Sequence, residues 1–395
     1  MPTINHRTIR RFYEAALRDR NPQAFYDDFS EALRRQEVKP EDFSLRRLFA
    51  EFVPAGRELL ESWNPRSGGG VQLQEANSAV DLAAFSNITG QVVYHAILAG
   101  MQAEELVFSK QVRTIPTAFD GEKIPEIGGL GDSAEIVAEG QPYPTIGVGE
   151  DWIETPPTIK RGLIVPVTRE AIFFDRTGVL LDRCREVGEV LGLAKEKRII
   201  DAIIDGNSTA HRYKWKGTSY ATYQASSPWV NIKSSNPLED WTNIDGAEQT
   251  LAAISDPHTG EPMLSTPKHL IVPRDLLYSA RRIVNATEVN VATPGFATSG
   301  KPRETRGANP VAGVSILSSQ LLSSRMTAAS FAAGTWLLGD LRRALAYMEN
   351  WGITVDQRGD DSDLAFERDI VLRFKASERG AIATLEPRVM CKNTA

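Results

Sequence analysis

The stretch GVLLDRCREVGEVLGLAKEKRIIDAIIDG, residues 178–206, organises the rest of this chain. Its apolar side chains recur at steps of three and four, the pattern of one buried stripe on an α-helix: Leu180, Cys184, Val187, Leu191 and Ala194. Gly178 and Gly206 stand where glycine usually flanks a helix. At about 1.5 Å per residue the helix would be roughly 40 Å long. Such a rod fits the backbone of a subunit, and taken alone it also fits an ordinary long core helix.

Composition sets broad bounds on what the protein is. The chain has 395 residues, 42% of them hydrophobic, which is enough for two or three cores. A formal net charge of -6 argues against a general nucleic-acid binder. Two cysteines, Cys184 and Cys391, are too few for a disulfide framework. The absence of a long apolar run and of a secretion signal predicts a soluble, cytoplasmic, multi-lobed protein with no membrane span.

Residues 1–63 contain three short apolar stripes at helical spacing. They consist of Ile9, Phe12, Tyr13, Ala16 and Leu17; of Phe25, Phe29 and Leu33; and of Phe43, Leu48, Phe49 and Phe52. Short helices bury little surface by themselves, so we expect them to pack on another part of the chain. A small helical subdomain and an assembly or scaffolding segment fit this pattern equally well.

A flexible break, NPRSGGG, follows at Asn64–Gly70. Residues 71–86 show no strong period and are predicted to form an extended arm. A helix is predicted over residues 88–106, followed by a strand over 107–114.

Residues 116–162 are rich in glycine and proline and lack a helical period. Acidic residues in this segment far outnumber Lys123, Lys160 and Arg161. Compact domains rarely hold so long a segment without a reason. Its scattered isoleucines and valines need cover, which a neighbouring subunit could supply. We predict a long β-hairpin that reaches across an interface, and a disordered loop is the alternative.

The remainder of the chain mixes strands and helices. Leu163–Asp175 is predicted to begin as an edge strand, because Pro166 has no N–H to give to a ladder. The middle region reads as an inserted α+β domain, with surface loops at 213–229 and 293–310, helices at 244–254 and 273–284, and strands at 269–272 and 311–317. From Trp336 strands dominate, and we predict a closing hairpin with its turn at Ser377–Gly380.

Taken in order, these segments resemble a tailed-bacteriophage major capsid protein of the Hong Kong 97 type. The resemblance covers about Asn64 to Ala395, and its specificity lies in the order and spacing of loose motifs. These are VAEGQPYP at 137–144, KRGLIVPVTREAIFFD at 160–175, the long helix, LIVPRDLL at 270–277, WLLGDLRRALAYMENWGITV at 336–355 and FERDIVLRFKASERGAIATLEPRV at 366–389.

The resemblance implies an α+β fold of the Hong Kong 97 type with a named anatomy. Its parts would be a helical N-terminal extension at 1–63, an N-arm and lead-in at 64–115, an E-loop at 116–162, a peripheral P-domain with the spine helix at 163–209, an axial A-domain at 210–335, and return strands of the P-domain with a closing hairpin at 336–395.

The function implied by the resemblance is self-assembly into the icosahedral head of a tailed phage or prophage. Partners would be the chain itself in pentamers and hexamers, with portal protein and scaffold or decoration proteins. The shell would enclose double-stranded DNA without reading its sequence, and it would assemble in the bacterial cytoplasm. No catalytic residue, cofactor or metal is expected.

Two properties of some family members are not carried over to this chain. One is an isopeptide bond between lysine and asparagine, for which Lys123 and Asn350 are of the right types but nothing local makes the pairing specific. The other is proteolytic removal of an N-terminal scaffolding segment, which residues 1–62 resemble in composition. Both loss and retention of that segment stay open at this point.

Several chemical motifs are weak. GFATSGK at 295–301 matches most of a phosphate-binding loop, but Pro302 stands where a magnesium-binding Ser or Thr is needed. Arg358, Gly359 and Asp360 spell an adhesion tripeptide by chance, and Asp360, Asp361 and Asp363 lack the spacing of a calcium loop. None of the five histidines has a partner at the short spacing of a zinc site: His6, His95, His211, His258 and His269.

Two rival functions remain at this stage. An encapsulin-like compartment shares the Hong Kong 97 fold but encloses cargo enzymes; the larger A-domain and the helical N-terminal segment favour the phage interpretation. A multi-domain hydrolase or nucleotide enzyme would need a convergent polar site, which the sequence does not show.

Overall fold

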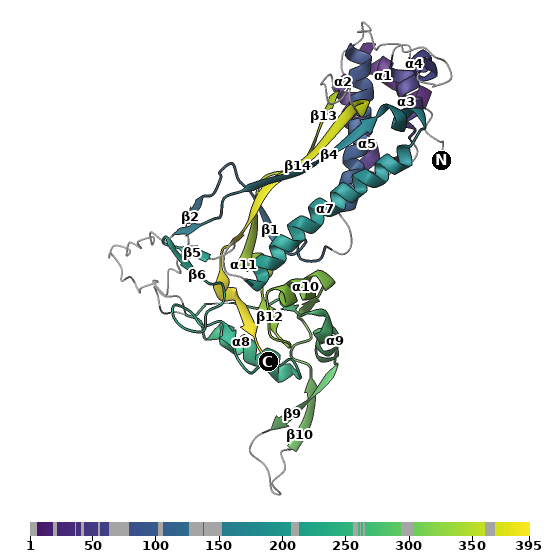
Figure 1. The fold of residues 1–395 in the computed structure, drawn as a ribbon. Helices are drawn as coiled ribbons and strands as arrows, with labels where there is room; N and C mark the ends of the chain where they lie inside the picture. Colours follow the sequence, from purple (N-terminus) through teal and green to yellow (C-terminus); the bar gives the residue numbers. More distant parts are fainter. Residues whose placement is uncertain are drawn as a thin grey trace. The chain divides into compact units, whose positions relative to one another are not determined.

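The computed structural model describes residues 6–18, 22–35, 37–40, 43–53, 56–62, 79–101, 106–125, 137, 152–206, 213–255, 260, 262–263, 265–293, 303–359 and 368–395 (Figure 1). The chain forms two compact units. Unit 1 holds Met1–Glu104, Lys160–Ala194 and Trp351–Arg379, and unit 2 holds Glu105–Ile159, Lys195–Asn350 and Gly380–Ala395. Within the described ranges no helix is both long and apolar enough to cross a lipid bilayer.

Helix α7, Thr177–Ile204, confirms the predicted long helix. Its stripe is buried, since Leu180, Cys184 and Leu191 are 7%, 0% and 3% exposed. Gly178 lies inside the first turn and not before it as predicted. At the first residue of the helix, the Thr177 hydroxyl accepts the Leu45 N–H at 2.8 Å and donates to Asp175 at 2.7 Å, which ties the start of α7 to the start of α3.

Helix α5, Ala79–Met101, begins and ends earlier than the predicted 88–106. The prediction of an extended arm is therefore wrong for residues 79–86. Phe85 is fully buried and its ring meets that of Phe49 edge-on, with centroids 5.4 Å apart. This contact with a distant part of the sequence has no signature in the local period.

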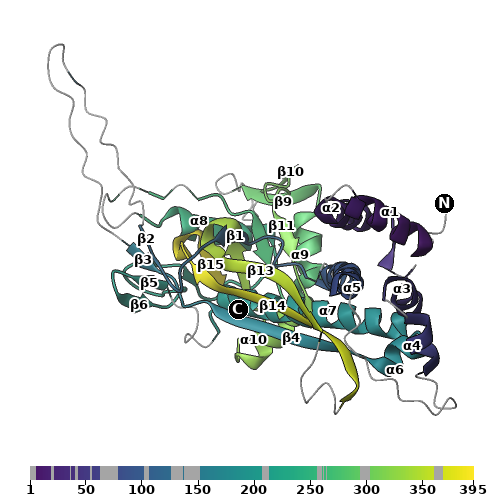
Figure 2. The same cartoon turned by 90° about the horizontal axis from the view of Figure 1, so that it is seen from above.

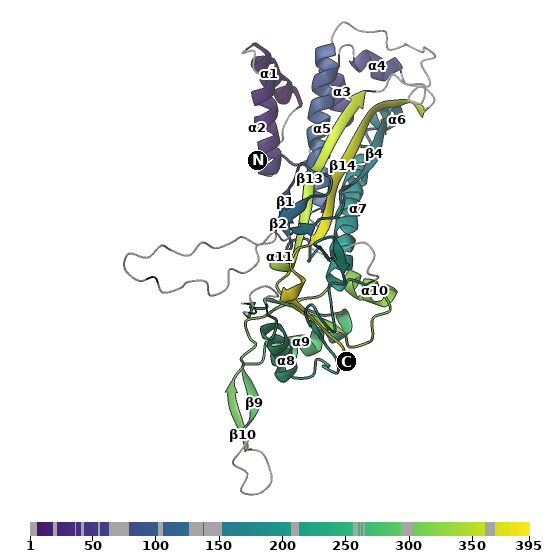
Figure 3. The ribbon, with the colours of Figure 1, turned by 90° about the vertical axis from the view of Figure 1, so that its left-hand side faces the viewer.

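The N-terminal helices are α1 (His6–Arg18), α2 (Pro22–Arg34), α3 (Leu45–Phe52) and α4 (Gly56–Ser62). Figure 3 shows α1 and α2 on one side of α5 and α3 and α4 on the other. Their buried side chains join α5, the first turns of α7 and part of β14 in one core, which bears out the expectation that they pack on another part of the chain. Phe12 was assigned to the buried stripe of α1, but it is 64% exposed.

A sheet of four strands has the order β1-β13-β14-β4. Its strands are β1 (Arg113–Pro116), β4 (Ile159–Thr168), β13 (Leu345–Gly359) and β14 (Ile370–Thr384), and Figure 2 shows β13 and β14 side by side. β4 lies at the edge, as Pro166 predicted, and the short helix α6 (Arg169–Phe173) follows it. Gly162 allows close approach to β14, since a Cβ atom there would lie 2.5 Å from the Ala376 carbonyl oxygen.

The predicted strand over 107–114 is mostly a turn, and β1 starts only at Arg113. The turn is held by Glu196 of α7, whose carboxylate accepts the N–H groups of Phe108 at 2.7 Å and Ser109 at 2.8 Å. Glu196 is 1% exposed, so these two bonds satisfy a buried charge.

The predicted turn at Ser377–Gly380 is wrong, because β14 runs straight through it. Ser377 and Glu378 are buried, and the Thr354 hydroxyl of β13 donates to the Ser377 carbonyl at 3.2 Å. Gly380 serves close packing instead of a turn: a Cβ there would lie 2.7 Å from the Tyr347 ring.

Unit 2 is built on a sheet of five strands with the order β11-β8-β12-β15-β7. These strands are β7 (Ile232–Lys233), β8 (His269–Ile271), β11 (Ser315–Leu317), β12 (Trp336–Gly339) and β15 (Met390–Asn393). Helices in this unit are α8 (Trp241–Ala252), α9 (Leu277–Val284), α10 (Gln320–Ala328) and α11 (Leu341–Ala344), with 3-10 turns at Arg274–Leu276 and Pro387–Val389. Trp336, fully buried, lies in the core between this sheet and α8.

Two segments of unit 2 that we predicted to be loops contain strands. Residues 213–229 include β5 (Tyr213–Trp215) and β6 (Thr218–Tyr220). Residues 293–310 include β10 (Arg303–Ala308), which pairs antiparallel with β9 (Glu288–Thr293) in a ribbon that leads away from α9 (Figure 1). The described residues confirm the predicted α+β class.

Candidate assembly surfaces

The segment predicted to reach across an interface starts from a closed base. β2 (Lys123–Pro125) pairs antiparallel with β3 (Trp152–Glu154), and β3 pairs with β5, so the base is part of a four-stranded sheet with the order β2-β3-β5-β6. The antiparallel pairing expected of a hairpin is confirmed at this base. The rest of the predicted hairpin, residues 126–136 and 138–151, lies outside the described residues.

Buried threonines lock the base of this hairpin. Asp120 accepts both the backbone N–H and the hydroxyl of Thr158, at 2.8 and 3.0 Å. The Thr155 hydroxyl accepts the Glu122 N–H at 2.9 Å, and the Thr155 N–H donates back to the Glu122 carbonyl at 2.9 Å. A base held in this way can carry an extended segment without a core of its own.

Charged side chains cluster on the same base. Glu154 forms ion pairs with Lys214 and, at 3.9 Å, with Lys123. The hydrogen bond from Lys214 is the main reason why the pKa of Glu154 is lowered. The Lys123 ammonium also lies 4.9 Å from the centroid of the Trp152 ring. Lys123 therefore interacts with Glu154 and Trp152, two residues of its own hairpin.

Asn350, the other residue weighed for a cross-link, is likewise used inside its own chain. Its side-chain amide donates to the carbonyls of Thr117 and Phe119, both at 3.0 Å. These bonds fix the chain where β1 passes into the hairpin. A role in cross-linking gains no support from this arrangement.

The edge strand β4 exposes large apolar side chains. Leu163 is 39% exposed and Ile164 is 58% exposed, while Val165 and Val167 are buried. Natural edge strands usually carry charges or proline to prevent pairing with other chains. β4 has such protection at Lys160, Arg161 and Pro166. Its exposed apolar residues, Leu163 and Ile164, are called the β4 patch below; as neighbours in a strand they face opposite sides of the sheet, and Ile164 lies on the side away from Val165 and Val167.

Helix α7 exposes a second apolar row. Val190 and Leu193 are one turn apart and are 48% and 40% exposed, and Val179, about three turns earlier, is 59% exposed. Near the start of the helix Phe174 is 59% exposed. We take the β4 patch and the α7 row as the candidate surfaces for contact with a protein partner.

The chemical motifs of the sequence form no site in the part of the chain that the structure describes. GFATSGK, the aspartates at 360–363, His211 and His258 lie outside it. Cys184 is a core residue, and burial raises the pKa of its thiol to about 12. Among the described residues no group of His, Cys, Asp and Glu side chains could hold a metal ion.

A family model described as phage capsid protein matches residues 153–393. The chain belongs to this family. The resemblance to a phage capsid protein is thereby confirmed, and the capsid protein is a structural component of a virion shell that works by associating with copies of itself. No curated protein matches its sequence.

Several solved structures are similar to the capsid protein at low sequence identity. The virus-like particle from Pyrococcus furiosus is 11% identical with a TM-score of 0.41, over 76% of this chain and 97% of that chain. A capsid structure of the cyanophage P-SCSP1u is 14% identical with a TM-score of 0.43, over 74% and 87%. The capsid of a native GTA particle is 10% identical with a TM-score of 0.44, over 74% and 90%. We rest the assignment on the family match.

The matched range of the capsid protein contains both exposed apolar surfaces. It includes β4, α7 and the return strands β13 and β14, and it begins inside β3 at the base of the hairpin. Helices α1 to α5 precede it. The sequence did not single out the exposed residues of α7, because an exposed valine on a long helix looks like any other surface residue.

Proposed function

We propose that this capsid protein is the shell-forming subunit of a tailed phage or prophage head of the Hong Kong 97 type. Copies associate head to tail into rings of five and six, a heterologous contact that closes. The rings then build an icosahedral shell around double-stranded DNA. The observation that carries the proposal is the family match over residues 153–393, which takes in the β4 patch and the α7 row.

The proposed anatomy gives each segment a mechanical task. Residues 64–115 act as an N-arm and lead-in, and residues 116–162 act as an E-loop that overlies a neighbouring subunit. The peripheral P-domain comprises residues 163–209 and the return strands at 336–395, and the axial A-domain comprises 210–335. In this division β7, β8 and β11 of the five-stranded sheet fall in the A-domain, and β12 and β15 fall among the return strands. At the base Ile153 is already buried in the core of unit 2, at 4% exposure. The cover that we propose from a neighbour therefore concerns Ile127, Ile136 and Ile146.

Assembly needs no catalysis in this proposal. A stable contact between subunits requires roughly 1,200 Å² or more of buried surface. An arm that crosses onto a neighbour adds such area without enlarging the subunit core. Many modest contacts repeated over the shell then hold the packaged DNA, with a portal protein and scaffold or decoration proteins as further partners in the bacterial cytoplasm.

Purified full-length protein tests the proposal by sedimentation velocity and negative-stain microscopy. We expect closed shells of uniform diameter, or rings that convert into shells on concentration. A compact monomer at high concentration would overturn the proposal. Nuclease-protected DNA inside particles taken from host cells separates a phage head from an encapsulin-like compartment, whose particles would contain cargo enzyme instead.

A further inference from the structure

Unit 2 contains a cavity of about 390 Å³ that no part of the proposed assembly mechanism uses. Four of its lining side chains are cationic: Lys110, Arg113, Lys268 and Arg342. The volume lies in the range of small-molecule pockets, roughly 300–1,000 Å³. The chain as a whole has a formal net charge of -6, so the positive charge around this cavity is opposite in sign to that of the whole chain.

The backbone around the cavity is well fixed. Lys110 lies in the turn before β1, and Arg113 is the first residue of β1. The buried Glu196 carboxylate holds this turn through Phe108 and Ser109. Lys268 directly precedes β8. Arg342 lies in the first turn of α11, where the Asp340 side chain accepts its N–H at 3.1 Å.

The single acid of the cavity is already fully engaged. Asp340 is 1% exposed and receives the Lys268 ammonium at 2.7 Å as well as the Arg342 backbone N–H. Among the residues that the structure describes, Lys110, Arg113 and the guanidinium of Arg342 have no acidic partner. Three uncompensated positive charges therefore border one cavity.

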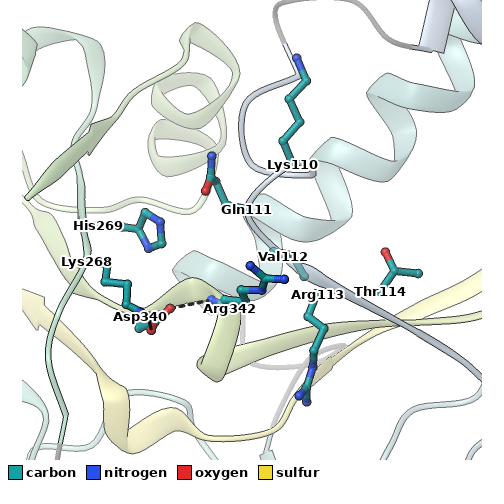
Figure 4. Close-up of a pocket in the computed structure, with 9 residues that line it drawn as sticks. All are labelled: Lys110, Gln111, Val112, Arg113, Thr114, Lys268, His269, Asp340 and Arg342. Atoms are coloured by element: carbon teal, nitrogen blue, oxygen red, sulfur yellow. Dashed lines mark hydrogen bonds and ion pairs between the residues drawn. The ribbon is translucent and has the colours of Figure 1, made fainter.

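The directions of these side chains suggest an extended ligand. Figure 4 shows Arg342 reaching from α11 toward the 110–114 segment, while Lys110 and Arg113 point to opposite sides of that segment. Charges spread in this way suit a chain of phosphates better than one compact ion. Arginine in particular matches phosphate oxygens with two parallel N–H groups.

We propose that this cavity binds an extended phosphate chain, either the backbone of a nucleic acid or a free polyphosphate. The contact is electrostatic and independent of sequence, since four cations line the cavity and no Phe, Tyr or Trp side chain is among its lining residues. The proposal does not depend on the shell-forming function.

Fluorescence anisotropy on the purified full chain tests the proposed phosphate binding by measuring the affinity for each probe. The probes are a labelled single-stranded oligonucleotide, a labelled duplex and long-chain polyphosphate. We expect Arg113→Gln with Arg342→Gln to weaken binding of at least one phosphate probe about tenfold and to lower its salt slope by about one for each cation removed. Arg343→Gln, an exposed neighbour outside the cavity lining, is the matched control and should leave the slope unchanged.

The arms of the experiment distinguish the sources of phosphate. Loss of oligonucleotide or duplex binding in the double variant assigns the cavity to a nucleic-acid backbone, and loss of polyphosphate binding alone assigns it to a free polyphosphate. Polyglutamate provides the last comparison. Equal binding of polyglutamate, unchanged slopes in the double variant, or no phosphate binding by the wild-type chain would each overturn the proposal.

Discussion

At the scale of single residues, the crossing of α5 and α7 depends on two glycines. A Cβ atom at Gly188 would lie 2.0 Å from the Ile97 carbonyl oxygen, and one at Gly100 would lie 2.1 Å from the Arg185 carbonyl oxygen. Real Cβ atoms do not approach backbone oxygen so closely, so the two helices would have to separate. Overpacking of this kind costs about 1–3 kcal/mol.

We therefore predict that Gly188→Ala lowers the free energy of unfolding by about 1–3 kcal/mol, measured by urea denaturation of the soluble subunit. Gly178→Ala is the control in the same helix, because nothing lies within 4 Å of its Cβ position. That change should stabilise the subunit by up to about 1 kcal/mol, since alanine is the better helix former. Equal effects at the two positions would contradict the proposed contact.

Leu191 gives a second residue-scale prediction. It is 3% exposed on the buried stripe of α7, so Leu191→Asp places an unpaired charge in the core of unit 1. We expect loss of soluble protein on expression. Leu193→Asp, two residues further and 40% exposed, should give soluble protein with an unchanged circular dichroism spectrum. Insoluble protein from both variants would show that the burial of the leucine side chain does not decide whether the variant is soluble.

The structural roles of Leu191 and Gly188 also differ in how well they can be predicted from sequence. Leu191 is identified by its period alone, because a helix repeats its buried side every three or four positions. Gly188 reads from sequence as a weak point in a helix. The need for glycine at position 188 comes from the close approach of the Ile97 backbone, and Ile97 is far away in the chain. No local sequence pattern contains that contact.

At the scale of elements, sequence predicted what local periodicity determines. The long helix α7, the helix α8 and the edge position of β4 follow from apolar spacing and from Pro166. The prediction of a turn at 377–380 rested on serine and glycine, which are common in turns. It was wrong because β14 pairs with β13 along that stretch. Long-range pairing outweighed the local turn preference.

The E-loop supplies the first element-scale prediction. Replacing residues 126–151 with a short Gly-Ser linker between Pro125 and Trp152 keeps the antiparallel base of β2 and β3. We expect a folded subunit with an unchanged melting temperature that no longer forms shells, seen by sedimentation velocity. A deletion of all of 116–162 would remove β2, β3 and the first four residues of β4, so it could not separate folding from assembly. Normal shells from the shorter deletion would refute the bridging role.

The N-terminal helices supply the second element-scale prediction. Leu48 and Phe49 of α3 are each 1% exposed and share a core with Phe85 of α5. Deleting residues 1–62 would expose that apolar face, so we predict aggregation of the truncated chain and retention of the segment in finished particles. Mass spectrometry of particles gives the length of the chain. Shells built from a chain that lacks α1 to α4 would identify the segment as a removable scaffold instead.

At the scale of the whole molecule, folding and association use separate surfaces. The buried side of β4 carries Val165 and Val167, and its exposed residues Leu163 and Ile164 contribute little to the core of unit 1. An exposed substitution typically changes stability by less than about 0.5 kcal/mol. The same substitution acts at every copy of a repeated contact in a shell, so a small local cost is multiplied across the assembly.

Ile164→Asp should therefore separate the two processes. We expect the melting temperature of the subunit to stay within a few degrees of the wild-type value, because the side chain is 58% exposed. Assembly should fail, because the aspartate would bring an unpaired charge into each contact that buries the β4 patch. Ile164→Val keeps the apolar character and should still form shells. If Ile164→Asp assembles as readily as Ile164→Val, the patch faces solvent in the finished shell, and the α7 row becomes the surface that neighbouring copies cover.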